Sequence, residues 1–145
     1  MSINIEIHFL YKVNPEYFSK YGTLTDVISS FYEDHLIKHG INKKHIIKEK
    51  VSQISFNELL KKYSIEKFDL LIIDTEGYDC HIVNDFFSKI KRIRPIVIFE
   101  WSHIKNSDLK DTLQLIVKNN YSFFPIGEDV FCYPLEKEIS LKLNK

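Results

Sequence analysis

The hydrophobic pattern changes character along the chain. Apolar residues alternate with polar ones over residues 3–13, which is typical of a strand with one face in water. The pattern becomes continuous at residues 70–73 and again at residues 96–99. Uninterrupted apolar runs of this length are typical of strands buried on both faces in a parallel sheet. The two runs end at Asp74 and Glu100, so the sequence predicts two central strands that each finish at a carboxylate.

Helical spacing of apolar residues appears between the predicted strands. It predicts helices that bury one face over residues 24–40, 56–63, 79–90 and 107–117. Ser55 and Glu58 have the spacing of a capping box before the second of these helices. Ser107 is the predicted N-cap of the fourth helix, and Gly40 is expected to end the first.

The remaining segments complete a predicted α/β fold. Residues 46–54 form a lysine-rich strand near a sheet edge. Residues 121–125 and 129–133 form a hairpin around Gly127, and the last dozen residues are charged and predict a loose helix. Strands that alternate with helices indicate βαβ units. We therefore expect a mainly parallel sheet with a C-terminal antiparallel hairpin and helices on both faces.

Composition narrows the class of protein. The 145 residues are enough for one domain, and 20 basic and 20 acidic side chains give zero net charge. A neutral chain offers little attraction to nucleic acid or to an anionic membrane. No apolar run approaches the roughly 20 residues that a membrane span needs. The two cysteines, Cys80 and Cys132, are too few for a disulfide framework, so we expect a cytoplasmic protein.

The carboxyl ends of the two apolar runs are the predicted functional edge, because ligands of open α/β sheets bind there. Neighbouring strands lie about 4.8 Å apart, so Asp74 and Glu100 could reach one ligand. The pair could share a divalent cation. One acid could instead be a general base whose pKa the other's charge raises, or both could bind a polyol. The sequence leaves these three uses open.

Other polar residues near this edge have competing explanations. Acids that follow a strand also cap the next helix, which explains Asp79 equally well. Gly77 is expected to adopt a positive φ in a turn. Glu76 and His103 lie on the same predicted rim, and His103 could reach the site. The other histidines show no ligand spacing or belong to a helix surface: His8, His35, His39, His45 and His81.

Three of these blocks occur together in a known family. Residues 51–60, 69–79 and 96–101 resemble the FkbM family of S-adenosylmethionine-dependent methyltransferases, and the similarity extends over about residues 5–134. The family pattern has an Ile-Asp-x-Glu-Gly strand end, a helix, an apolar strand that ends in Glu, and a hairpin that opens on Tyr. The residues at the matching positions are Asp74, Glu76, Gly77, Glu100 and Tyr121.

The resemblance implies a Rossmann-like sheet and transfer of a methyl group from S-adenosylmethionine to an oxygen of a sugar, a polyketide or another small metabolite. The candidate catalytic residues are then Asp74, Glu76, Glu100 and His103. By fold-level analogy with metal-dependent O-methyltransferases, a divalent metal between the strand-end acids would acidify the acceptor hydroxyl.

One departure from the family pattern concerns the cofactor. The chain has only four glycines, which form no Gly-x-Gly turn, and no acid stands where the family holds the ribose. We therefore expect residues 1–145 to be a single, incomplete domain, the C-terminal portion of a methyltransferase that needs the cofactor-binding half for activity. The strand at residues 70–73 would then have an open edge, which favours self-association or a partner chain. The alternative is a non-catalytic remnant or interaction module that retains the substrate side of the fold.

Two other enzyme classes share part of the motif at residues 74–76. Metal-dependent exonucleases begin with such paired acids, and His81 and Asp85 follow here, but those acids belong on a first strand and a neutral chain gives DNA little to hold. Aspartyl-phosphate phosphatases begin similarly, but no clear downstream lysine and paired aspartates follow.

Overall fold

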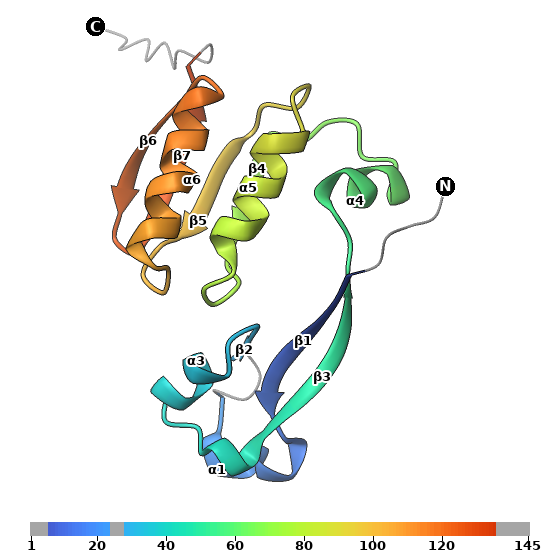
Figure 1. The fold of residues 1–145 in the computed structure, drawn as a ribbon, viewed down its shortest axis with the longest axis vertical. Coiled ribbons are helices and arrows are strands. Elements are labelled where there is room, and N and C mark those ends of the chain that lie inside the picture. Colours follow the sequence, from blue (N-terminus) through green and yellow to red (C-terminus); the bar gives the residue numbers. More distant parts are fainter. Residues whose placement is uncertain (1–5, 24–27, 136–145) are drawn as a thin grey trace, which may run out of the picture.

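The computed structural model describes residues 6–23 and 28–135 and divides them between two sheets (Figure 1). The N-terminal elements form a three-stranded sheet in the lower part of the view, and the C-terminal elements form a four-stranded sheet in the upper part. The protein is therefore a mixed α/β fold. The expectation of a single, mainly parallel sheet is wrong.

The first sheet is antiparallel, with the strand order β2-β1-β3. Its strands are β1 (Glu6–Val13), β2 (Ser29–Ser30) and β3 (Ile46–Gln53). The helical segments beside it are η1 (Pro15–Tyr17), α1 (Phe18–Tyr21), α3 (Glu33–Lys38) and η2 (Lys43–His45). The lysine-rich strand β3 lies at the sheet edge, as predicted, because β1 is the only one of the described strands that pairs with it.

A small core lies under the first sheet. Its buried members are Val13, Ile28, Leu36 and Ile41. The alternation predicted for the first strand is only partly realised: Val13 is buried, whereas Phe9 on the same predicted face is exposed, with the Lys48 ammonium 3.8 Å from its ring centroid.

The second sheet has the order β4-β5-β7-β6. Its strands are β4 (Leu70–Ile73), β5 (Ile96–Glu100), β6 (Tyr121–Ile126) and β7 (Asp129–Pro134). The pair β4–β5 is parallel, whereas β5–β7 and the β6–β7 hairpin are antiparallel. The accompanying helices are α4 (Phe56–Lys62), α5 (Asp79–Lys89) and α6 (Asn106–Lys118).

Helices α5 and α6 cover one face of the second sheet (Figure 1). Val97 and Phe99 of β5 are fully buried beneath these helices together with Val83 of α5, because alternate strand residues point to the same face. On β4, Leu70 and Ile72 are 50% and 63% exposed. The prediction of strands buried on both faces is therefore wrong for β4: a continuous apolar run supplies two apolar faces but does not determine that both are covered.

Most local predictions for the C-terminal elements are confirmed. The capping box is present, with the Ser55 hydroxyl accepting from the Glu58 N–H and the Glu58 carboxylate accepting from the Ser55 N–H. Helix α5 and the hairpin around Gly127 also lie where the sequence places them. However, α6 begins at Asn106 after Lys105, and the Ser107 hydroxyl bonds to Asp108, so Ser107 is not the N-cap.

The predicted helix over residues 24–40 is mostly wrong. Ser29 and Ser30 form β2, and α3 begins only at Glu33; residues 24–27 lie outside the described residues. Gly40, with φ +83°, follows the end of α3 as predicted. The loose helix predicted for the last dozen residues lies almost wholly outside the described part. None of the described helices has the length and apolar character to cross a membrane.

Candidate functional site

The carboxyl ends of β4 and β5 lie side by side. The parallel register pairs Ile73 with Phe99, so Asp74 and Glu100 follow at equivalent positions at one edge of the sheet. The prediction that two carboxylates follow neighbouring parallel strand ends is confirmed. Their side chains, however, are exposed to different degrees: Asp74 is exposed, whereas Glu100 is half-buried.

The turn after β4 is held in an uncommon conformation. Glu76 has φ +54°, a left-handed conformation that costs a residue with a side chain about 1–3 kcal/mol, and Gly77 has φ +99° as predicted. Asp79 accepts from the Thr75 hydroxyl at 2.9 Å and from the Gly77 N–H at 3.3 Å. The Ser30 hydroxyl of β2 donates to the Glu76 carbonyl at 2.9 Å. Both parts of the fold therefore fix the position of Glu76.

The Glu76 carboxylate lies against a buried histidine from the first sheet's layer. Glu76 Oε2 is 2.7 Å from Nε2 of His35, whose side chain is only 7% exposed. The Glu76 carboxylate is therefore the polar partner of this buried nitrogen. Burial lowers the pKa of His35, and the charge of Glu76 only partly opposes this shift, so the neutral imidazole is favoured.

A second acid–histidine pair follows β5. Glu100 Oε1 lies 3.4 Å from Nε2 of His103, and the Ser102 hydroxyl donates to the same carboxylate. Burial is the largest influence on Glu100 and raises its pKa. The negative charges of Asp74 and Glu76 add to this shift, whereas Ser102 and His103 oppose it. A carboxylate with a raised pKa is a stronger base at neutral pH than an ordinary surface acid.

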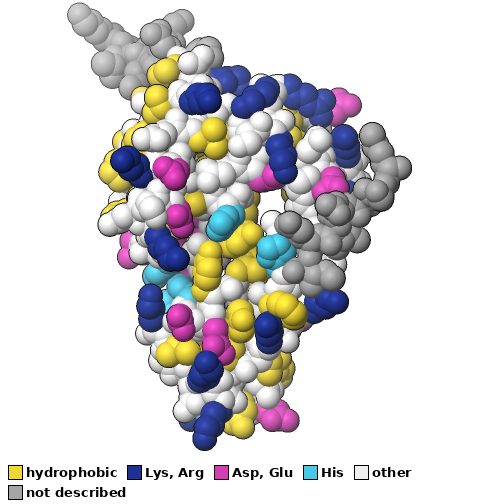
Figure 2. Space-filling view, in the orientation of Figure 1, with side chains coloured by type: hydrophobic (Ala, Val, Ile, Leu, Met, Phe, Trp, Pro, Cys, Tyr) yellow, Lys and Arg dark blue, Asp and Glu magenta, His cyan; other side chains and the backbone are white. Residues whose placement is uncertain are grey.

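The two pairs belong to one cluster. Ligand atoms of Glu76, Glu100 and His103 lie within 4.8 Å of one another, as do those of His35, His39 and His103. Figure 2 shows histidine side chains at separate places across the middle of the visible face. The cluster therefore combines groups from α3, from the turn after β4 and from the segment after β5.

Two cavities adjoin the cluster. The larger of the two has a volume of about 430 Å³, and its lining includes His35, Glu76, Ser102 and His103. The smaller has a volume of about 280 Å³ and is lined by Asp74 and Glu76 together with apolar residues from β1 and the segment after β2. Glu76 therefore lies between the two cavities. Asp74 lines only the smaller of these two cavities.

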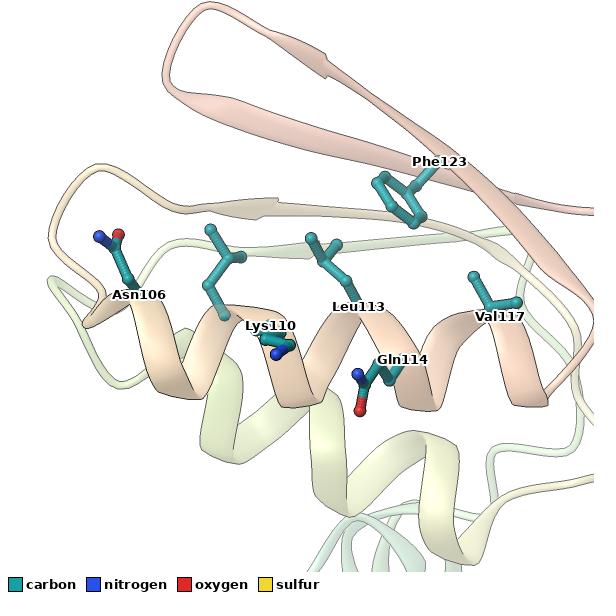
Figure 3. Close-up of a pocket in the computed structure, with 7 residues that line it drawn as sticks. Asn106, Lys110, Leu113, Gln114, Val117 and Phe123 are labelled. Carbon is teal, nitrogen blue, oxygen red and sulfur yellow. The ribbon is translucent and has the colours of Figure 1, made fainter.

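A third hollow lies elsewhere, between α6 and β6. Leu113 and Val117 point toward the strand that carries Phe123, and the volume is about 550 Å³ (Figure 3). Its other lining residues are Asn106, Leu109, Lys110 and Gln114. No carboxylate or histidine lines this groove.

Comparison with known proteins decides the family. A model of the methyltransferase FkbM domain matches residues 5–123. The chain belongs to the FkbM methyltransferase family. No curated protein and no solved structure matches it significantly. Membership indicates methyltransferase activity, with S-adenosylmethionine as the general cofactor of such enzymes and a small molecule as the acceptor.

The described residues do not form the glycine-rich cradle with which such folds hold this cofactor. A Cβ on Gly77 would meet the His103 carbonyl oxygen at 3.4 Å and a Tyr32 ring carbon at 3.7 Å, so this backbone packs against the chain's own atoms. The other three glycines lie singly in turns: Gly22, Gly40 and Gly127. We therefore assign no S-adenosylmethionine contacts to the described part of this FkbM-family chain.

Sequence reasoning missed two members of the cluster. His35 and His39 were expected to have no ligand spacing, but they are four residues apart at the end of α3, and this spacing brings side chains to one face of a helix. The signal was present in the sequence. It was obscured because the predicted helix began nearly ten residues too early and was therefore assigned the wrong apolar face.

Proposed function

We propose that this FkbM-family chain takes part in S-adenosylmethionine-dependent O-methylation of a hydroxyl group on a small molecule or a sugar. The observation that carries this proposal is the half-buried Glu100, with its raised pKa, beside His103 and Glu76 at the carboxyl ends of two parallel strands. Hydroxyl oxygens become adequate nucleophiles when a positioned base removes the proton.

The four acid and histidine side chains named from the sequence take distinct roles in this proposal. Glu100 accepts the acceptor's hydroxyl proton, and His103 holds the Glu100 carboxylate in place and carries the proton onward. Glu76, which lines both cavities, binds a second hydroxyl of the acceptor. Asp74, on the smaller cavity, binds a further polar group of a polyol or sugar. The raised pKa of Glu100 favours this base role over a divalent cation shared by Asp74 and Glu100.

The cofactor-binding groups come, in this proposal, from a strand that pairs with the outer edge of β4. Strand β4 is the last strand of the described sheet, and its Leu70 and Ile72 side chains are largely exposed. An apolar edge of this kind pairs readily with another strand. The strand would be supplied by a partner polypeptide, by a second copy or by another segment of the protein. The two free cysteines, Cys80 and Cys132, fit a reducing, cytoplasmic setting.

A second candidate function is a non-catalytic interaction module that retains the substrate side of the fold. The four glycines of the chain, which form no glycine-rich cradle in the described residues, favour it. The two candidates differ in one property. Only the methyltransferase binds S-adenosylmethionine, alone or with its partner strand in place.

Two measurements separate the methyltransferase from the interaction module. The first is calorimetric titration with S-adenosylmethionine. The second is a turnover assay that detects S-adenosylhomocysteine over a panel of sugars and small hydroxyl compounds. The methyltransferase proposal predicts saturable binding and turnover that Glu100→Gln lowers by about 100-fold or more, since general-base catalysis contributes about 10²–10⁴. Glu66→Gln, which changes an exposed acid in the loop before β4, is the matched control and should keep full turnover. Absence of heat and of turnover at every protein concentration, and with cell extract added as a source of partner, would favour the interaction module.

A further inference from the structure

Three imidazole rings meet where α3 approaches the segment after β5. The ring centroids of His35 and His39 are 4.4 Å apart, those of His35 and His103 are 4.6 Å apart, and those of His39 and His103 are 5.6 Å apart. One nitrogen from each ring lies within 4.8 Å of the others. Proton transfer from an acceptor hydroxyl needs at most one of these rings, so the other two call for a separate explanation.

The protonation of His39 is fixed by its backbone partner. Its Nδ1 lies 2.9 Å from the carbonyl oxygen of His35, and a carbonyl can only accept a hydrogen bond. Nδ1 therefore carries a proton, which leaves Nε2 as the nitrogen that could bind a metal. Histidines that bind metals typically donate their second N–H to a backbone carbonyl or carboxylate in this way.

His35 supplies an independent observation. Its side chain is more than nine-tenths buried, and its Nε2 lies 2.7 Å from a Glu76 oxygen. A buried ring nitrogen and a carboxylate oxygen therefore already lie together beside the other two rings.

We propose that His35, His39 and His103 bind one divalent transition-metal ion of the Zn²⁺ class, with a Glu76 oxygen as the fourth ligand. Three imidazoles with one carboxylate suit Zn²⁺ and similar ions, whereas Mg²⁺ and Ca²⁺ prefer all-oxygen sites. The cavity of about 430 Å³ beside His35 and His103 gives the ion access to solvent. The site goes beyond methyl transfer, and it shares His103 and Glu76 with the groups proposed for that reaction.

The geometry requires the outer ring nitrogens to move inward and the Glu76 oxygen, now 2.7 Å from His35 Nε2, to move slightly outward. Nitrogens bound to tetrahedral Zn²⁺ at about 2.05 Å lie about 3.3 Å apart, compared with the present limit of 4.8 Å. His39 and His103 are exposed, so side-chain rotation can bring their nitrogens inward while the buried His35 stays in place. The ion would then join α3 to the segment after β5 and hold the two parts of the fold together.

The test measures Zn²⁺ binding to the full chain, prepared without a polyhistidine tag. Metal content after dialysis gives the stoichiometry, calorimetry gives the affinity, and Co²⁺ in place of Zn²⁺ gives a visible absorption spectrum that reports four-coordinate geometry. The variants are His39→Gln and His103→Gln, both at exposed positions. His81→Gln is the control, since His81 is an exposed histidine of α5 outside the cluster.

The proposal predicts one Zn²⁺ per chain and a loss of affinity of at least about tenfold in His39→Gln and His103→Gln, with no change in His81→Gln. Three results would overturn it: no saturable binding, equal affinity in all variants, or preferential Mg²⁺ binding that Glu100→Gln abolishes and His39→Gln leaves intact. The last result would assign the ion to the carboxylates. Far-UV circular dichroism of each variant, expected to match the wild type, ensures that lost binding reflects a lost ligand.

Discussion

The buried Asp79 should make the protein less stable as the pH rises. Its side chain is fully buried at the start of α5, where it accepts hydrogen bonds from Thr75 and Gly77, and its Oδ1 has no partner among the described residues. Burial is the largest influence and raises the pKa of Asp79 above its ordinary value of 3.8, and the hydrogen bonds only partly offset this shift. The fold therefore favours the protonated acid.

This shift fixes the sign of the pH dependence. From about pH 4 upward, the unfolded chain loses the Asp79 proton before the folded chain does, so the folded state binds more protons. Its stability then falls with rising pH until the folded pKa is passed. One proton limits the slope to about 1.4 kcal/mol per pH unit. Asp79→Asn keeps an acceptor for Thr75 and Gly77 but does not titrate, so this contribution disappears.

The assay is urea unfolding, followed by circular dichroism and by the fluorescence of Trp101, at a series of pH values from about 4 to about 8. The free energy of unfolding of Asp79→Asn minus that of the wild type should rise with pH and then level off. Asp111→Asn, at an exposed position of α6, controls for the removal of one carboxylate and should give a flat difference. A flat or falling difference for Asp79→Asn would mean that the hydrogen bonds outweigh burial, and the reasoning would be refuted.

Two further predictions concern local structure and association. Ser55→Ala removes the capping box of α4 and should lower the free energy of unfolding by about 1 kcal/mol. Ser107→Ala removes no cap and should change it by less than about 0.5 kcal/mol. Urea unfolding measures both values, and equal losses in the two variants would contradict the assignment of Ser55 as the N-cap. Ile72→Lys places a charge on the exposed edge strand β4 and should weaken self-association, as measured by size-exclusion chromatography with light scattering. A wild-type protein that stays monomeric at high concentration would contradict edge pairing between copies.

Local patterns predicted the C-terminal half of the fold well. The strand at residues 70–73, the strand at residues 96–100 and the hairpin around Gly127 follow from apolar runs and turn residues, which depend on near neighbours in sequence. The partition into two sheets did not follow from the sequence. It depends on the pairing of β1 with β3 across more than thirty residues, and no local pattern records which strands will pair.

The sequence predicted the strand-end residues of the candidate site but not the histidines at the end of α3. Glu76, Glu100 and His103 follow strand ends, so sheet geometry alone brings them together. His35 and His39 come from a helix in the other part of the fold, and only the packing of the two parts places them beside Glu76. Asp74 was expected to reach one ligand together with Glu100; its exposed side chain lines the smaller cavity, and the shared ligand stays a prediction.

The central claim is that Glu100 is the base at a methyl-transfer site formed by two strand ends. It is tested most directly by the turnover of Glu100→Gln beside that of Glu66→Gln, with S-adenosylmethionine and an accepted hydroxyl substrate. Turnover should fall by about 100-fold or more in Glu100→Gln and should be unchanged in Glu66→Gln. Equal turnover in the two variants would contradict it.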